Sequence, residues 1–278
     1  MDLLPTSVRV LTLNLHCWQE EEAQGKLDRI ADAIAAHAVD VVCLQEVGQH
    51  VDAPIVDHRH GMDIRADNAA LAIVERLQRQ HRVAMDWAWG FSHIGFDVWE
   101  EGVAVLSRHP LRDVEVAFVS SGHSPVPVDA RCVVIASVER HPGVPLTVVS
   151  AHLSWWDHPH EPFAVQWQRT QAVLQYRPDP LLLAGDLNVR DDGPGYPLML
   201  QGDAWRDAHA LAVAPEAPRG TFPGDIAGWA GGPAGRIDYV LLRGAGLDPT
   251  ASEVLFDSAG DRVSDHFGVL VTIDATAR

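Results

Sequence analysis

The chain has 278 residues, 47% of them hydrophobic, so it is long and apolar enough to bury the core of one large α/β domain. This composition excludes wholesale disorder, and no stretch approaches the roughly 20 consecutive apolar residues of a membrane-spanning helix. The amino-terminal segment lacks the basic start of a signal peptide, so we expect a cytoplasmic protein. Without internal repeats or low-complexity linkers, residues 1–278 are expected to form a single domain.

The charge balance is strongly acidic. Lys and Arg total 21 against 38 Asp and Glu, for a net charge of −17, and Lys26 is the only lysine. Proteins that grip a nucleic-acid backbone carry a basic stripe, which this sequence lacks, so a nucleic-acid substrate is possible but disfavoured. Three widely spaced cysteines, Cys17, Cys43 and Cys132, are expected to be buried reduced thiols.

The first fifty residues predict a strand, a helix and a second strand. Residues 7–14 alternate in hydrophobicity and are rich in β-branched residues, residues 26–37 place their apolar side chains at helical spacing, and residues 40–45 form a continuous apolar run. This order is typical of a βαβ unit with parallel strands. Asn14 and Glu46 are then expected at strand carboxyl ends, where ligands bind in open α/β sheets.

The rest of the chain continues to alternate apolar runs with helical patterns and long loops. Further strands are expected at residues 103–107, 132–139, 146–150, 181–184, 237–242 and 269–273. Helices are expected at residues 68–80 and 162–176, with a short helical turn at 197–201. Long loops are expected at residues 48–66, 86–101, 120–130, 154–161 and 215–235, and loops of this length are usually functional or mobile.

Several of these strands end in polar residues that a buried strand would not otherwise need. The positions are Asn14, Glu46, His152, Asp186, Asn188, Asp238, Asp265 and His266. Any one Asn or Asp at a strand end is commonly just a turn former. Their recurrence along one chain instead indicates a site built from carboxylates, amides and imidazoles.

The motifs that contain these residues, in chain order LQE, HL, GDLN, RIDYV and SDH, resemble those of the endonuclease/exonuclease/phosphatase superfamily. The resemblance extends from the first strand to near the C-terminus. It implies an α/β (α+β) fold, a four-layer α/β sandwich of two packed mixed β-sheets flanked by helices. It also implies a hydrolase that acts on phosphoric ester bonds.

The resemblance further implies a metal site. Glu46 is the expected principal ligand, with Asn14 beside it and Asp265 contributing through the metal or its water. Oxygen-only ligands of this kind select a hard cation, Mg²⁺ or Mn²⁺, over zinc.

For the reaction itself, the resemblance makes His266 either the base partner of the attacking water or a cationic stabiliser, oriented by Asp238. Asp186 could instead hold or deprotonate the water, and the sequence does not decide between them. Asn188 is expected to donate to the phosphoryl group, and His152 to a non-bridging phosphate oxygen. Arg131, just before a strand, is expected to contact phosphate through its guanidinium.

The aromatic and histidine-rich loops allow two interpretations. Trp155, Trp156 and Trp229 either pack under long loops or wall a pocket for an organic leaving group. Glu100 and Glu101 either face the site or form a solvated pair at a strand entrance. The H-x-H pairs at residues 58–60 and 158–160 lack partners at zinc-finger spacing, so we expect them on the surface.

The leading hypothesis is a divalent-metal-dependent phosphoesterase that hydrolyses a phosphomonoester or phosphodiester of a small or moderately sized organic substrate by water attack at phosphorus. Three alternatives stay open: a DNA or RNA nuclease, a sphingomyelinase-like phosphodiesterase, and a catalytically inactive binding domain. Substrate identity, the number of metals and the oligomeric state are not readable from the sequence.

Overall fold

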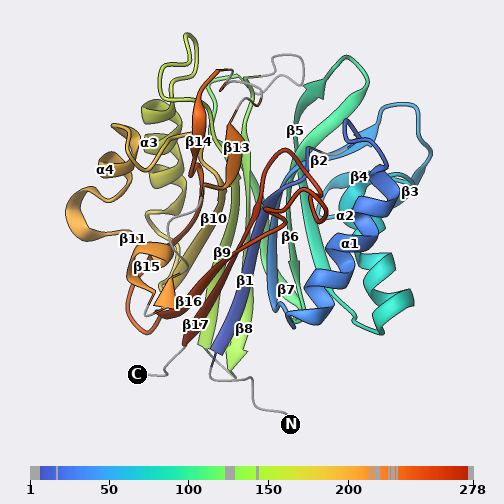
Figure 1. Ribbon diagram of the computed structural model, residues 1–278, viewed down its shortest axis with the longest axis horizontal. Helices are drawn as coiled ribbons and strands as arrows, with labels where there is room; N and C mark the ends of the chain where they lie inside the picture. The colour runs from blue at the N-terminus through green and yellow to red at the C-terminus, as the bar shows by residue number, and fades with distance from the viewer. Residues whose placement is uncertain are drawn as a thin grey trace.

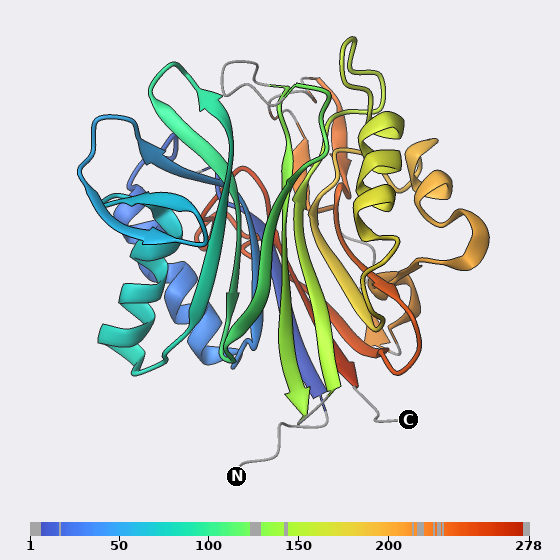
Figure 2. The same ribbon diagram turned by 180° about the vertical axis from the view of Figure 1, so that it is seen from behind.

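The computed structural model describes residues 7–16, 18–122, 129–141, 144–212, 214–215, 220–224, 226, 229 and 231–274. Two large mixed β-sheets lie face to face at the centre, with helices on both outer sides (Figures 1 and 2). The first sheet has seven strands in the order β12 (Ala214–Pro215), β16 (Asp248–Leu255), β17 (Gly268–Asp274), β1 (Ser7–Asn14), β2 (Val41–His50), β6 (Trp99–Ser107) and β5 (Asp86–Gly95). The second has six, in the order β11 (Arg206–Asp207), β15 (Asp238–Arg243), β10 (Leu181–Asp186), β9 (Val144–His152), β8 (Cys132–His141) and β7 (Leu111–Phe118).

Helices complete the outer layers. The first sheet is covered by α1 (Ala23–Ala36), α2 (Ala69–Arg76) and the π-helix η1 (Leu77–His81), and the second by α3 (Phe163–Leu174) and α4 (Gly195–Met199). The short elements are η2 (Gln201–Asp203), α5 (Ala208–Leu211) and two hairpins, β3 (Ile55–Arg59) with β4 (Met62–Arg65) and β13 (Phe222–Gly224) with β14 (Pro233–Gly235). This confirms the predicted four-layer sandwich.

The β1–α1–β2 unit forms as the hydrophobic pattern predicts. β1 and β2 pair in parallel, with Val10 opposite Val41 and Asn14 opposite Gln45. The helix buries one apolar stripe, which includes Leu27 and Ile30, against the sheet. Because the two strands are parallel, the end of β1 and the second half of β2 lie on the same side of the molecule.

Three apolar layers hold the sandwich together. The middle layer fills the space between the two sheets with short β-branched and small side chains, such as Val10, Val134 and Ala184. The outer layers contain larger groups. Ile30 and Ile73 pack between the first sheet and its helices, and Phe163 packs between the second sheet and α3. Small side chains between the sheets allow close packing, so the polar groups at the end of each sheet come within contact distance of the other.

The expectation of a loop at residues 86–101 was wrong, because β5 and the start of β6 form a hairpin there. The aromatic-rich run alternates faces: Trp87 and Trp89 are buried toward the helices, while Ala88 joins the layer between the sheets. Gly90 also faces that layer, where a Cβ would lie 2.7 Å from a methyl group of Val116. Trp and Phe are enriched in strands, so the high aromatic content of this segment indicates a strand and not a loop.

The sequence reading also missed β7, β16 and the β3–β4 hairpin, and it placed Glu46 at a strand end. β2 instead continues to His50, and its pairing with β6 shifts register between Leu44 and Val47. Glu46 lies in that β-bulge with φ 49°, a left-handed backbone conformation that is uncommon for residues other than glycine. The side chains of a regular strand point alternately to the two faces of the sheet, and the bulge interrupts this alternation at Glu46.

Two further expectations concern the thiols and the membrane. Cys43 and Cys132 are buried free cysteines, as predicted, whereas Cys17 lies outside the described residues. Burial raises the pKa of the Cys132 thiol to about 11. Among the described helices none is long and apolar enough to cross a membrane.

Candidate active site

Three neighbouring strands of the second sheet place polar side chains at one level. His152 ends β9, Asp186 ends β10 and Asp238 begins β15, and the pairing register sets His152 opposite Asp186 and Asp186 opposite Asp238. Asp238 is fully buried and Asp186 is 1% exposed. Burying two adjacent carboxylates costs free energy unless charge partners compensate, so this edge of the sheet is specialised for more than packing.

Asn14 connects this edge to the first sheet. Its fully buried amide nitrogen donates to Glu46 Oε1 at 2.9 Å and to Asp186 Oδ2 at 3.1 Å, which come from different sheets. Its Oδ1 accepts from the backbone N–H of His16 at 3.0 Å. Asn14 therefore lies beside Glu46, as predicted, and its Oδ1 accepts one backbone hydrogen bond.

His266 stands between the two buried aspartates. Its Nδ1 lies 3.1 Å from Asp238 Oδ2, and its Nε2 lies 3.7 Å from Asp186 Oδ2. Burial lowers the pKa of this imidazole, but the charges of Asp238 and Asp186 outweigh burial and raise the pKa to about 10. Burial also raises the pKa of Asp186 to about 7, against the opposing charge of His266. The structure thus brings together the three groups that the sequence placed in the water-activating machinery.

The sequence reading missed Thr221, which holds Asp238 in place. The fully buried Thr221 hydroxyl donates to Asp238 Oδ2, the oxygen that also faces His266. It accepts from the backbone N–H groups of Ile237 and Asp238 at 3.1 and 3.2 Å. The Thr221 carbonyl accepts from Phe267 N. One residue before β13 therefore ties the start of β15 to the segment that carries His266, a role that only the three-dimensional register reveals.

Asn188 and His152 form a second polar pair beside Asp186. The Asn188 amide nitrogen lies 3.2 Å from His152 Nε2 and donates to Leu153 O at 2.9 Å. Burial and the charge of Arg131 hold the pKa of His152 well below its usual range, so this imidazole is neutral and its Nε2 accepts from Asn188. The expected donation from His152 to phosphate stays a prediction.

Arg131 lies beneath the same space, 7% exposed, with Nη1 3.3 Å from His93 Nδ1. Burial lowers the pKa of Arg131, while the carboxylates of Glu46, Glu101 and others raise it. His93 Nε2 in turn lies 3.5 Å from Glu101 Oε2. Glu101 therefore faces the site, the first of the two interpretations open from sequence, whereas Glu100 pairs with Arg65 and is not part of the pocket lining.

All of these groups surround one pocket of about 420 Å³. The predicted site residues that line it are Glu46, Arg131, His152, Asp186, Asn188, Asp265 and His266. Asn14 and Asp238 lie behind this lining and contact it through hydrogen bonds. Further lining residues that sequence reasoning did not assign to the site are His16, Gln19, His93, Gly95, Phe96, Asp129 and His158.

The carboxylate groups around the pocket fit a hard divalent cation. Glu46 and Asp265 both line it, and Glu46 has its pKa raised by burial and by the like charges of Glu101 and Asp265. A cation would relieve that repulsion, and carboxylate oxygens are ligands that Mg²⁺ and Mn²⁺ prefer. Among the described residues, two groups of side chains have ligand atoms close enough to share an ion: His16 with Glu20 and Asp265, and the buried set of Asp186, Asp238 and His266. Glu46 belongs to neither group.

The H-x-H pairs fall in different surroundings. His58 is exposed and pairs with Asp63 at 2.7 Å. His158, in contrast, lines the pocket, so its expected surface position was wrong. It stacks on Trp155 with ring centroids 5.8 Å apart, and its Nε2 lies 3.4 Å from Asp129 Oδ1. The turn that follows β9 folds the 154–161 loop back over the site, which spacing alone did not indicate.

Comparison with known proteins agrees with this architecture. A model of the endonuclease/exonuclease/phosphatase family matches residues 11–266. A family protein from Leptotrichia buccalis C-1013-b is similar in structure, with 27% identity, a TM-score of 0.84 and coverage of 96% of this chain and 99% of that one. Curated protein sequences give no match.

Two further solved structures share the fold. A mannosyl-6-phosphatase from Bacteroides thetaiotaomicron VPI-5482 is 16% identical with a TM-score of 0.69, covering 96% of this chain and 99% of that one. D. rerio TDP2, solved with a single-strand DNA product, is 18% identical with a TM-score of 0.69, covering 98% of this chain and 100% of that one. The family match over most of the chain decides the classification: this chain belongs to the endonuclease/exonuclease/phosphatase family and is a hydrolase acting on phosphoric ester bonds.

Proposed function

We propose that this protein is a divalent-metal-dependent phosphoesterase that hydrolyses a phosphomonoester or phosphodiester of a small or moderately sized organic substrate by water attack at phosphorus. One observation carries the proposal: side chains from both sheets meet at a single pocket, where Asn14 bridges Glu46 and Asp186. The pocket volume of about 420 Å³ suits a small substrate. The net charge of −17 opposes a long polyanion.

Glu46 and Asp265 are the residues that would hold Mg²⁺ or Mn²⁺. A bound divalent cation supplies charge that polarises a phosphoryl oxygen and stabilises the leaving oxygen. Asn14, through its amide nitrogen, keeps the Glu46 carboxylate oriented toward the pocket. In this arrangement Asn14 acts as a positioning residue rather than a ligand.

Asp186 holds the attacking water and accepts its proton. Asn14 donates to Asp186 Oδ2, and Asn188 N donates to the other oxygen, Oδ1, at 2.9 Å, so the carboxylate is fixed in orientation. His266 Nε2 faces the same Oδ2, while Asp238 holds the opposite ring nitrogen. His266 is then a cationic donor that offsets the negative charge developing on the phosphoryl group.

Arg131 is the residue that would contact the phosphate in this proposal. It lines the pocket and is 7% exposed, so a charge-assisted hydrogen bond from its guanidinium would be shielded from water. Asn188 also lines the pocket, but it donates both of its amide hydrogens within the protein, to His152 Nε2 and to Leu153 O. Asn188 would therefore donate to the phosphoryl group by exchanging one of these two hydrogen bonds for one to the substrate.

Hydrolysis of p-nitrophenyl phosphate and bis-p-nitrophenyl phosphate tests the proposal. We expect activity with Mg²⁺ or Mn²⁺ that is lost in EDTA and in His266→Ala, and the better of the two cations identifies the working metal. Glu46→Gln should raise the metal concentration needed for half-maximal rate by roughly tenfold or more. Activity that persists in EDTA, or an unchanged metal titration in Glu46→Gln, would contradict the assignment.

A further inference from the structure

The outer part of the pocket is bordered by an aromatic side chain that packing does not require. Phe96, at the tip of the β5–β6 hairpin, lines the pocket and is 69% exposed. Phe96 and Asp97 adopt φ of 49° and 62°, a turn conformation that normally favours Asn and Gly. A phenylalanine here has an unfavourable backbone conformation and an unburied ring. Such a combination is typical of a residue kept for ligand contact.

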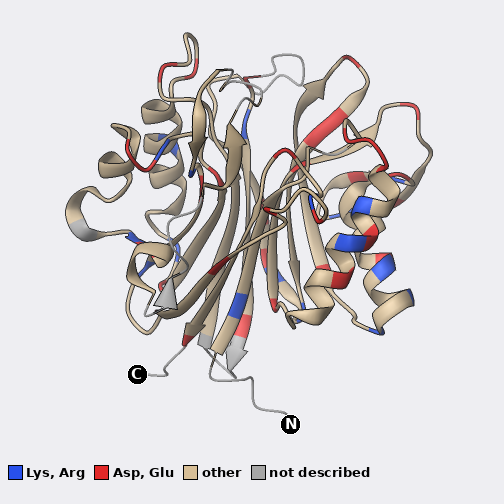
Figure 3. Ribbon diagram, viewed as in Figure 1, with Lys and Arg blue, Asp and Glu red and all other residues tan. Residues whose placement is uncertain are grey.

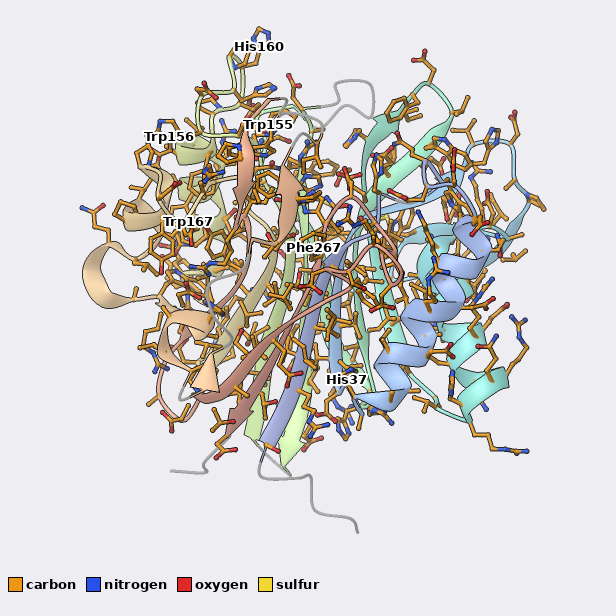
Figure 4. All side chains as sticks on the ribbon, viewed as in Figure 1. His37, Trp155, Trp156, His160, Trp167 and Phe267 are labelled. Atoms are coloured by element: carbon orange, nitrogen blue, oxygen red, sulfur yellow. The ribbon has the colours of Figure 1, made fainter. Side chains whose placement is uncertain are left out.

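The loop after β9 supplies another aromatic wall. Trp155 lines the pocket, and its indole Nε1 is buried with no hydrogen-bond partner among the described residues. Figure 4 shows this side chain near the upper end of the molecule, the same end at which the hairpin tip lies in Figure 1. The loop is preorganised, because the backbone N–H groups of His158 and Phe163 both donate to Trp155 O, at 3.3 and 3.0 Å. Because Trp155 lines the pocket, its indole contributes an aromatic surface to this wall.

Carboxylate–imidazole pairs form the polar part of this wall. His158 Nε2 faces Asp129 Oδ1 at 3.4 Å, and His93 Nε2 faces Glu101 Oε2 at 3.5 Å. Gly95 allows the second pair, because a Cβ there would lie 2.1 Å from Glu101 Oε1. Each pair offers both an acceptor and a donor, which is the complement of a hydroxyl group.

These features select one kind of leaving group. Aromatic faces suit the flat apolar side of a ring, and the adjoining carboxylates suit hydroxyls while repelling further negative charge. A plain acyl chain would offer no hydrogen-bonding group to Asp129 and Glu101, and a polyphosphate would be repelled by them. We propose that the outer pocket, formed by Phe96, Trp155, Asp129, His158 and Glu101, is a subsite for a neutral hydroxylated ring attached to the scissile phosphate, as found in sugar phosphates and nucleoside monophosphates. This inference rests on the proposed phosphoesterase function.

A matched pair of neighbouring tryptophans provides the test. Trp155→Phe keeps an aromatic ring but removes the indole N–H, and Phe96→Ala removes the exposed ring. Trp156→Phe is the control, because Trp156 is outside the pocket lining, is 39% exposed and packs on Phe163. Tyr176→Ala, at an 88% exposed position, controls for the loss of a surface aromatic. Steady-state kinetics would compare glucose 6-phosphate and adenosine 5′-monophosphate with methyl phosphate, each as the monoester and as its methyl diester.

The quantity to follow is the ratio of kcat/KM for a ring substrate to kcat/KM for the matching methyl compound. We expect this ratio to exceed one in the parent enzyme and to fall roughly 3- to 10-fold in Trp155→Phe and in Phe96→Ala, but not in the two controls. The sugar and nucleoside arms identify which ring the subsite prefers. A ratio below one, or one that Trp155→Phe and Phe96→Ala leave unchanged, would overturn the subsite while leaving the phosphoesterase function intact. Failure to hydrolyse any ester, including bis-p-nitrophenyl phosphate, would overturn both.

Discussion

Two buried polar clusters lie within three residues of each other at the start of β15, and they do different things. The first, the Arg236 cluster, consists of Arg236, Asp207, Asp191, Tyr196 and Tyr239. The second, the Asp238 cluster, consists of Asp238, Asp186, His266, Glu46 and Asn14. Asp191 is exposed, but each cluster contains buried charges, Arg236 with Asp207 in the first and Asp186 with Asp238 in the second. Burying charges usually costs free energy. Their partners and their access to solvent distinguish them.

The Arg236 cluster is a structural network. The Arg236 guanidinium lies 2.8 Å from Asp207 and 3.3 Å from Asp191, and its centre lies 4.6 Å from the Tyr239 ring and 5.5 Å from the Tyr196 ring. Tyr196 adds a 2.8 Å hydrogen bond to Asp207, and burial together with that carboxylate raises its pKa to about 12. The positive charge of Arg236 is matched by Asp207 and Asp191, although its Nη1 is buried with no hydrogen-bond partner among the described residues. None of these residues lines the pocket.

The Asp238 cluster has the opposite balance. Two carboxylates, Asp186 and Asp238, share one imidazole, and Glu46 joins them through Asn14. Asp238 Oδ1 has no hydrogen-bond partner among the described residues. The cluster opens onto the pocket through Glu46, Asp186 and His266. Charge in excess of its partners, facing a cavity, is the arrangement expected of a site that takes up a cation and a reacting group. The comparison therefore supports the proposed catalytic role of the Asp238 cluster and a structural role for the Arg236 cluster, without reference to sequence motifs.

The basic residues of the whole molecule fit that contrast. In Figure 3 the blue segments are spread over helices and loops on several sides rather than gathered along one stripe of the ribbon. Many arginines are engaged in ion pairs, such as Arg65 with Glu100 and Arg76 with Asp28. A continuous basic path for a nucleic-acid backbone does not appear among the described residues.

The largest expected effect is on catalysis. Asp186→Asn should lower kcat by about 10²- to 10⁴-fold, because the amide cannot accept a proton from water. The same change removes one of two facing buried carboxylates, so the thermal midpoint in EDTA should rise. The measurement is kcat with p-nitrophenyl phosphate alongside differential scanning fluorimetry. Loss of both activity and stability would place Asp186 with the structural cluster.

Next in size is the stability effect at the neighbouring cluster. Arg236→Ala leaves Asp207 buried without its cation and should lower the free energy of unfolding by about 3–5 kcal/mol. Urea unfolding followed by tryptophan fluorescence measures this loss. Activity per folded molecule should persist below the transition. If kcat collapsed while the unfolding midpoint stayed in place, the division between the two clusters would be wrong.

Thr221 offers a finer test, because its hydroxyl donates to Asp238 from outside the pocket. Thr221→Val removes one hydrogen bond to a buried carboxylate, worth about 1.5–3 kcal/mol, and should lower kcat by roughly 10- to 100-fold with little change in KM. Thr221→Ser keeps the hydroxyl and should restore most of the rate. A serine variant no better than valine would show that shape, and not the hydrogen bond, matters at this position.

The smallest effect concerns His152 and pH. Burial and the like charges of Arg131, His93 and His266 hold the pKa of His152 in the folded state well below its ordinary value. Asp186, at 3.6 Å, faces the same imidazole. The unfolded chain binds a proton there first, so stability is lost as the pH falls below about 6.5. Between pH 7.5 and 5.5 the parent protein should lose roughly 1 kcal/mol more than His152→Gln. If urea titrations show the same loss of unfolding free energy between the two pH values in the parent and in His152→Gln, His152 does not cause this pH dependence.

The strands at the centre of the sandwich were predictable because they combine strong apolar patterning with β-branched residues. β1, β8, β9 and β10 are examples. The edge strands were not. β7 is partly exposed, with a burial pattern close to that of a loop, and the aromatic content of β5 suggested a binding loop. An edge strand forms because it pairs with a neighbouring strand. The hydrophobic periodicity of the edge segment alone does not reveal this pairing.

The site divides in the same way. Residues inside short motifs, such as Asp186 and His266, were identified because the motif fixes both identity and place. Thr221, His93 and Asp129 belong to no such motif and reach the site through register, a bulge and a loop. Asn14 was identified, but its hydrogen bonds, and with them its role, depend on the side-chain orientation that the structure supplies.

Asn14 has a wider consequence, because its single amide group touches carboxylates that belong to opposite halves of the sandwich. With the roles proposed for Glu46 and Asp186, the spacing of the two sheets would influence the rate of the reaction. A substitution deep in the layer between the sheets, far from any substrate, would alter the distance between these two carboxylates. Turnover should then decline while the protein is still folded, so that activity would be a sensitive measure of core packing.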